Sequence, residues 1–169
     1  MSGAPQFSRR VPLARVGSEP FRQHIAADEA ERDALAKRFA LVSLDRLEAD
    51  VELEREITGT ILLTAAFAAE FVQECIVTLD PVAGSVSEGF QLRYGPAEAE
   101  ADAPSGDDPA FEPLSGEAID IGEAVAQEFS LSLPPFPRAA DAVVSTEAAE
   151  QASDGPFAAL ARLARGESQ

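Results

Sequence analysis

His24 and Cys75 are the chain's only histidine and only cysteine, the residue types that often act as general base, nucleophile or soft metal ligand. Nucleophilic catalysis pairs a serine or cysteine with a base, and no motif of that kind accompanies His24. We interpret His24 as a surface histidine in a polar loop before the first expected helix. Cys75 lies among strand-forming residues in Val72–Leu79, which favours a small buried hydrophobe over a nucleophile.

The sequence gives equally little support for a metal site or a phosphate-binding loop. A structural zinc site needs about four nitrogen or sulfur ligands, so one cysteine and one histidine exclude a Cys/His site within a single chain. The carboxylates Asp102, Asp107 and Asp108 lack the spacing of an EF-hand loop, and a solvated loop explains them. Gly84–Gly89 lacks both a nucleophile elbow and a Walker lysine, and a β-turn explains it. We therefore predict no enzyme, no cofactor and no metal site.

Four arginines near the N-terminus form the only basic group of interest. If residues 7–16 form a strand, Arg9 and Arg15 share one face and Arg10 points to the other. Arg22 follows after a break at Gly17–Pro20. An exposed, solubilising role is the favoured interpretation, and the four are also our candidate RNA contacts.

The charge of the chain is unevenly distributed. The formal net charge is −17, yet residues 1–50 hold eight acidic and eight basic side chains. Residues 96–155 hold fourteen acidic side chains against one basic, Arg138. Such a chain repels polyanions, so generic binding to nucleic acid is disfavoured, and we expect no DNA partner. A basic protein fits the surface better.

The element predicted most clearly is a helix within Ile119–Arg138. Asp120 is a plausible N-cap, with Glu123 completing a pair like a capping box. Large apolar side chains recur at every fourth position, at Ile121, Val125, Phe129 and Leu133. Because Pro134 disfavours helix at the residue before it, the helix should end near 130–132, followed by an extended Pro-Pro-Phe-Pro segment.

A second helix is predicted over residues 28–41. Asp28 and Glu31 form a capping box, and the apolar stripe is Leu35, Phe39 and Val42. The remaining periodic segments predict strands at 7–16, at 47–54, where apolar and acidic residues alternate, and at 86–94. Residues 60–82 suit two strands or one long bent strand, and the alanine-rich part at 65–69 leaves helix as an alternative.

These elements predict an α+β fold, a twisted antiparallel sheet with both helices packed on it. The proline segment should run along the sheet or its edge. One domain is expected at 1–138, with a mobile acidic loop at 96–113, a disordered linker at 139–155 and a short amphipathic segment at 156–165. A single cysteine suits a reducing compartment, 1–10 lack a signal peptide, and 61–69 are too short to cross a bilayer, so we predict a cytoplasmic protein and no membrane partner.

Three segments together resemble a known family. They are Leu44–Leu53, the string Val72-Gln-Glu-Cys-Ile-Val-Thr-Leu-Asp-Pro-Val82, and Ile119–Arg138, joined later by Pro156–Leu163. In this order they resemble the YceD family, the large ribosomal RNA subunit accumulation proteins of bacteria, in its alphaproteobacterial form. The motif positions are Gln73, Cys75, Thr78, Pro81, Asp120, Gly122, Glu123, Pro134, Pro135, Pro137 and Arg138.

The resemblance implies a role in the synthesis, processing or stability of large-subunit (23S) ribosomal RNA. Many relatives carry a second cysteine near the position of Gln73, and some have further cysteine pairs. This chain has neither, so no metal or redox role is carried over to it.

The resemblance and the charge together suggest a non-enzymatic ribosome-biogenesis factor. Its acidic surface would hold a basic ribosomal protein or assembly factor, and rRNA accumulation would follow indirectly. One alternative is a protein that binds large-subunit rRNA directly through Arg9, Arg10, Arg15 and Arg22. The other is a metal-dependent hydrolase that uses Asp and Glu side chains.

Overall fold

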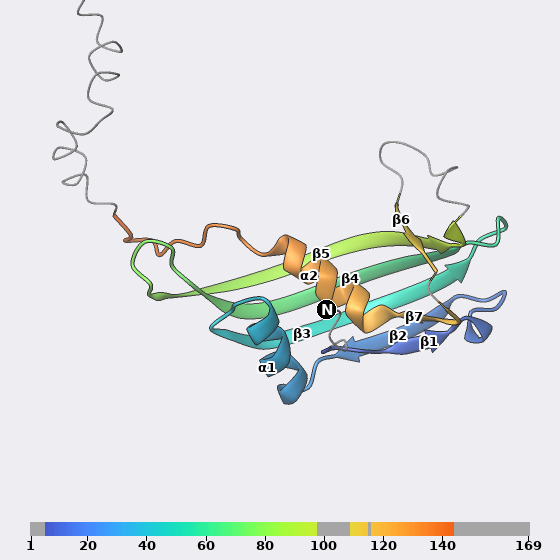
Figure 1. Ribbon diagram of the computed structural model, residues 1–169, viewed down its shortest axis with the longest axis horizontal. Coiled ribbons are helices and arrows are strands. Elements are labelled where there is room, and N and C mark those ends of the chain that lie inside the picture. Colours follow the sequence, from blue (N-terminus) through green and yellow to red (C-terminus); the bar gives the residue numbers. More distant parts are fainter. Residues whose placement is uncertain (1–5, 98–108, 115, 144–169) are drawn as a thin grey trace, which may run out of the picture.

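The computed structural model describes residues 6–97, 109–114 and 116–143 as a curved sheet with two helices on one face (Figure 1). The strands are β1 (Arg10–Pro12), β2 (Phe21–Ala26), β3 (Ser43–Arg55), β4 (Ile61–Glu74), β5 (Pro81–Gly95), β6 (Ala110–Pro113) and β7 (Ala118–Asp120). The helices are α1 (Glu29–Arg38) and α2 (Ile121–Ser132), with a short 3-10 helix at Leu13–Arg15. The predicted α+β class is confirmed.

The main sheet has the strand order β2-β3-β4-β5-β6. All its neighbours pair antiparallel except β5 and β6, which are parallel, so the predicted antiparallel sheet is mostly confirmed. Residues 60–82 contain one long strand, β4, the turn after it and the first two residues of β5. Although alanine favours helix, residues 65–69 lie in β4, because alternate side chains there (Ala65, Phe67, Ala69) face the core.

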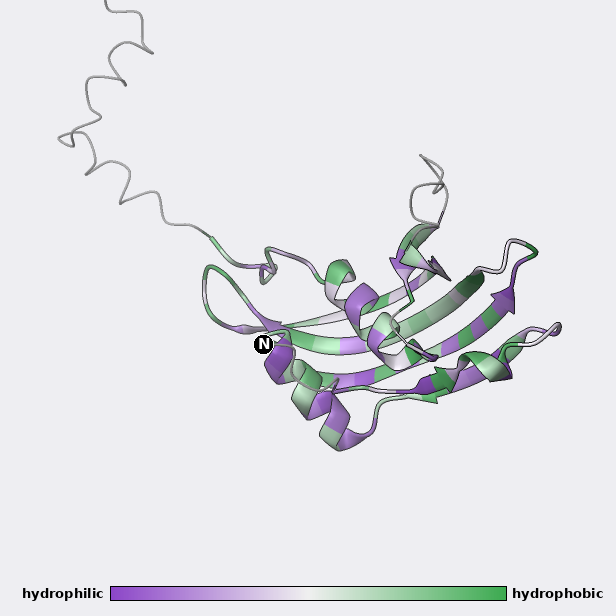
Figure 2. Ribbon diagram, turned by 45° about the vertical axis from the view of Figure 1, so that its right-hand side comes forward, coloured by the Kyte–Doolittle hydropathy of each residue, from purple (hydrophilic) through white to green (hydrophobic). Residues whose placement is uncertain are grey.

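Both helices pack on the same face of this sheet. Phe129 of α2 lies at the centre, fully buried, with its ring 5.9 Å from that of Phe39 and 5.6 Å from that of Phe71. Leu35 of α1 is also fully buried. The stripe predicted for this helix is wrong at Val42, which lies beyond the helix and is 59% exposed. The other face of the sheet is open to solvent (Figure 2).

The helix ends follow the predicted capping chemistry. The Asp28 carboxylate accepts from Glu31 N, and the Glu31 carboxylate accepts from Asp28 N, a full capping box. At α2 the Asp120 carboxylate accepts from Glu123 N, and the helix ends at Ser132 before Pro134, as predicted. Only one half of the predicted pair forms at α2, because the Glu123 carboxylate instead binds Arg38.

The predicted strand over 7–16 is wrong in its extent. Within this segment only Arg10–Pro12 form a strand, paired with β7 in a separate two-stranded sheet. Pro12 lacks a backbone N–H, and the chain turns into the 3-10 helix directly after it. Arg15 therefore lies in a helical turn and does not share a strand face with Arg9.

Two further predictions concern the acidic segments. Within the predicted mobile loop 96–113, residues 110–113 form strand β6 beside β5, which corrects the loop's C-terminal boundary. Residues 98–108, most of the predicted linker (144–155) and the predicted C-terminal segment (156–165) lie outside the described residues. Among the described helices, none has the length and apolar character needed to cross a membrane.

Candidate functional site

The two proline-containing motifs predicted from the sequence meet at one end of the sheet. After α2 the chain runs back toward the turn between β4 and β5 (Figure 1). We call residues 134–139 the strap. Gln73 Nε2 donates to Pro134 O at 3.1 Å, and Ile76 N donates to Pro137 O at 3.0 Å. The prediction that the Pro-Pro-Phe-Pro segment runs along the sheet is therefore correct at the end of β4.

Cys75 joins the strap to the turn. Its side chain is fully buried, as predicted, although it follows β4 instead of lying within a strand. Its sulfur accepts from Ala139 N at 3.4 Å and from Thr78 N at 3.5 Å. The hydroxyl of Thr78, with the N–H groups of Ala139 and Thr78, lowers the pKa of the Cys75 thiol to about 7. The thiol is thus a hydrogen-bond acceptor that holds two segments together.

The turn between the strands is tightly closed. Leu79 N donates to Cys75 O at 3.0 Å, and Cys75 N donates to Asp80 O at 2.8 Å. Leu79 has a φ of 65°, a left-handed conformation that is uncommon for residues other than glycine. Pro81, another motif position, is the first residue of β5. The motif string 73–82 therefore encodes a fixed turn and the anchor for the strap.

The second group of motif residues fixes the start of α2. The Asp120 carboxylate accepts from Ser8 Oγ at 2.5 Å, from Arg9 N at 2.7 Å and from Glu123 N at 3.2 Å. At Gly122, a β-carbon would lie only 2.5 Å from the carbonyl oxygen of Phe7. These positions hold the N-terminal segment against the helix, which is a structural role.

The four candidate RNA-contacting arginines are not gathered into one free patch. Arg9 donates to both carboxylate oxygens of Glu31, at 2.6 and 2.8 Å, and to Ala26 O at 3.0 Å. The Glu31 carboxylate raises the pKa of the Arg9 guanidinium. Arg22, on the open face of the sheet, pairs with Glu52 at 2.6 Å. Arg15 stacks on the ring of Phe21, and Arg10 is exposed on β1.

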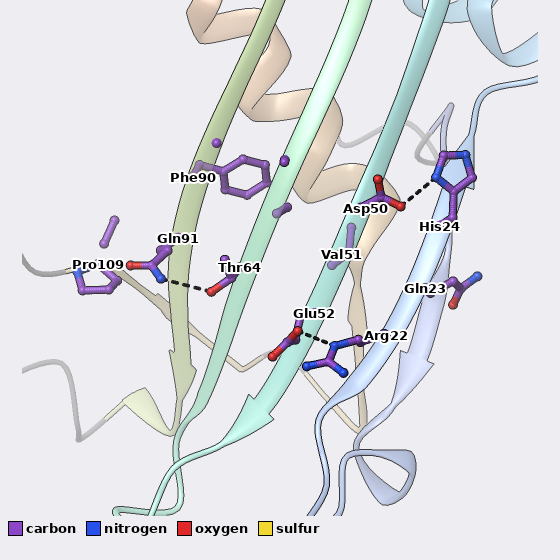
Figure 3. Close-up of a pocket in the computed structure, with 14 residues that line it drawn as sticks. Arg22, Gln23, His24, Asp50, Val51, Glu52, Thr64, Phe90, Gln91 and Pro109 are labelled. Atoms are coloured by element: carbon purple, nitrogen blue, oxygen red, sulfur yellow. Dashed lines mark hydrogen bonds and ion pairs between the residues drawn. The ribbon is translucent and has the colours of Figure 1, made fainter.

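A groove of about 960 Å³ lies on the open face of the sheet (Figure 3). His24 lies here on β2, so the predicted loop position is wrong; the alternation in Phe21–Ile25 was the overlooked strand signal. Its Nδ1 lies 2.9 Å from an Asp50 carboxylate oxygen. Between β4 and β5, the hydroxyl of Thr64 accepts from Gln91 Nε2 at 3.1 Å. Polar side chains are thus paired across neighbouring strands on this face, as expected for a surface that faces solvent or contacts a partner.

No three His, Cys, Asp or Glu side chains within the described ranges are grouped so as to hold a metal ion. The surroundings of Glu128 on α2 disfavour its charged form. Desolvation raises its pKa, and the negative charges of Glu112 and Glu88 raise it further.

Comparison with known families decides the assignment of the chain. The family model described as "Large ribosomal RNA subunit accumulation protein YceD" matches residues 63–164, more than half of the chain. The chain belongs to the YceD family. Membership implies a role in the accumulation of large-subunit ribosomal RNA and so in ribosome biogenesis. Comparisons with curated proteins and with solved structures gave no match.

The YceD match contains every motif position predicted from the sequence, including both sides of the contact between strap and turn. The segment Leu44–Leu53, which also contributed to the resemblance, lies outside the matched range. So do the four N-terminal arginines. The part of the chain that carries the family signal is therefore β4, β5, α2 and the strap.

Proposed function

We propose that this YceD protein is a non-enzymatic ribosome-biogenesis factor that supports large-subunit rRNA through contacts with a basic protein. The partner is a ribosomal protein or an assembly factor. The protein–protein contact comes first, and the accumulation of rRNA follows from it.

The proposal rests on how the positively charged side chains are paired within the chain. The described residues hold 21 acidic side chains and 11 basic ones. Five of the arginines are already bound by the chain's own carboxylates: Arg9, Arg22, Arg38, Arg46 and Arg93. Each such pair partly neutralises the guanidinium and occupies some of its five N–H donors, which weakens its attraction for a phosphate. The surplus on the surface is negative, and it suits a cationic protein.

Direct RNA binding by Arg9, Arg10, Arg15 and Arg22 remains the main alternative. The geometry favours it less, because Arg9 is bound bidentately and Arg22 is paired. If this alternative held, affinity for RNA would fall steeply with salt, and Arg→Ala changes would reduce that dependence.

The proposal is tested by charge reversal in cells depleted of the protein. A variant with Glu112→Lys, Glu117→Lys and Asp141→Lys changes three exposed acids of the acidic part of the chain. The matched control carries Glu19→Lys, Asp33→Lys and Glu54→Lys, also exposed, in the first third of the chain. We expect the control to restore large-subunit rRNA and the first variant to fail. Equal rescue by both variants would overturn the proposal.

A further inference from the structure

Large apolar side chains are exposed together at the end of the sheet where the strap meets the turn. Ile76 and Leu79 in the turn are 48% and 67% exposed, and Phe136 of the strap is 73% exposed. Val143, just beyond the strap, is 81% exposed. We call these four residues the apolar tip. Figure 2 shows the hydrophobic colouring of the turn between β4 and β5 at this end.

The segments that carry the apolar tip are held in place by hydrogen bonds. Ile76 N donates to Pro137 O, next to Phe136, and Leu79 N donates to Cys75 O. Ala142 N donates to Ala139 O, and Ala139 N donates to the Cys75 sulfur, which ties the chain at Val143 back to the turn. An ordered surface loses little conformational entropy when a partner binds, so these contacts preorganise the tip for docking.

The segments that carry the apolar tip also carry exposed acidic side chains. Glu74 at the end of β4, Asp80 in the turn and Asp141 beyond the strap are all exposed. Arg138 is the only basic residue within 74–81 and 134–143. Exposed apolar side chains with a charged rim are typical of protein interaction sites, and a negative rim selects a positive partner.

We propose that the apolar tip is the docking surface for a cationic, amphipathic segment of a partner protein. Apolar side chains of the partner cover Ile76, Leu79 and Phe136, and its lysines or arginines face Glu74, Asp80 and Asp141. The inference rests on the proposed function, since it gives the basic partner its binding site. A second copy of this chain fits less well, because each copy carries a net charge of −17.

The test uses the full chain and the protein fraction of large ribosomal subunits from which the rRNA has been digested. The tip variants are Leu79→Asn and Phe136→Asn. Asparagine tolerates the left-handed backbone at position 79, so the turn is retained. The matched control is Ile57→Asn, because Ile57 is fully exposed in the turn between β3 and β4, away from the tip. Separately, a benzophenone side chain at position 136 identifies what lies against the apolar tip, and one at position 57 identifies what lies against the turn between β3 and β4.

We expect the wild-type chain to bind a basic protein of this fraction and each tip variant to bind it about tenfold more weakly or worse. We expect Ile57→Asn to bind as wild type, and the benzophenone at position 136, but not at 57, to cross-link to the same protein. Circular dichroism and urea unfolding check that all three variants remain folded.

Three other outcomes overturn the inference in different ways. If the wild-type chain binds no protein of the fraction, a ribosomal protein is excluded as the partner in the proposed function, and the docking site for it fails as well. If wild type and both tip variants bind equally, the docking site is wrong while the proposed function stands. Cross-linking from position 136 to a second copy, or to residues 156–165 of the same chain, would assign the tip to a different occupant.

Discussion

Arg38 on α1 binds Glu123 on α2 through two hydrogen bonds of 2.9 and 2.7 Å. Their side chains are 31% and 20% exposed, so solvent screens this ion pair only in part. Nearby, the ring of Phe39, the residue directly after α1, packs edge to face against the ring of Phe129 on α2. The pair therefore links α2, which contains the motif positions Gly122 and Glu123, with the helix of the N-terminal half.

Breaking this pair should destabilise the fold. We expect Arg38→Met and Glu123→Gln each to lower the free energy of unfolding at pH 7, with a coupling energy of about 1 kcal/mol in a double-mutant cycle. Urea unfolding of the four proteins measures it. A coupling energy of zero would show that the pair contributes nothing to the packing of the helices.

The same pair predicts a pH dependence. The Arg38 guanidinium lowers the pKa of Glu123, so the folded value lies below the unfolded value. The stabilisation is then complete above the unfolded carboxyl pKa and is lost as the pH falls through the folded pKa. In the Arg38→Met variant this acid-dependent loss should be smaller, as unfolding curves between pH 7 and pH 3 would show.

Replacing the glycine at the start of α2 should be costly. In Gly122→Ala the new β-carbon would lie 2.5 Å from Phe7 O and 3.0 Å from Arg9 N, so the N-terminal segment has to move. We expect a loss of about 1–3 kcal/mol in the free energy of unfolding, despite alanine's higher helix propensity. Gly17→Ala is the control, because nothing lies within 4 Å of a β-carbon there. Equal unfolding midpoints for both variants would contradict the close contact.

Removing the charge of Glu128 should stabilise the protein. Desolvation and the charges of Glu112 and Glu88 raise the pKa of Glu128 in the folded state, so its carboxylate form opposes folding near pH 7. Glu128→Gln should therefore raise the free energy of unfolding at pH 7, by less than about 1 kcal/mol because solvent screens the charges. The gain should vanish at a pH below both the folded and the unfolded pKa. Glu19→Gln, at an exposed position, should show no such gain.

The Cys75 sulfur should control how firmly the strap is held. Cys75→Ala removes the acceptor for Ala139 N and Thr78 N, and we expect the amide protons of these residues to exchange with solvent faster. Cys75→Ser keeps an acceptor at this position and should restore part of the protection. Hydrogen exchange followed by NMR measures these amide exchange rates. If the rates of Ala139 and Thr78 are unchanged in Cys75→Ala, the sulfur does not hold the strap.

Local patterns in the sequence were sufficient to predict α1 and α2 and the greater part of two strands, namely 47–54 within β3 and 86–94 within β5. Each of these elements has its own period, and each helix also has a start or stop signal, such as the capping box at Asp28 or the prolines after Ser132. The extent of the strand within residues 7–16 was harder to predict. Val11 and Leu13 alternate as in a strand, although pairing with β7 stops at Pro12. Only tertiary contacts, which the local pattern does not contain, determine where such a strand ends.

The motif residues of the site were identified from the sequence, but the contact between the two motif segments was not. Gln73 and Pro134 are 61 residues apart, and no local signal joins them. The pairing of Arg9 with Glu31 was also unforeseen, since charge counts do not show which acid binds which base. The apolar tip was missed for a related reason: Ile76 and Leu79 resemble strand residues until the turn exposes them.

The most direct test of the proposed function is an affinity purification of the tagged protein from cells, divided into RNase-treated and untreated halves. We predict that a basic ribosomal protein or assembly factor stays bound after RNase treatment. The contrary result is large-subunit rRNA that co-purifies together with ribosomal proteins, all of which are lost after RNase. That outcome would mean contact through RNA and would contradict a protein-first mechanism.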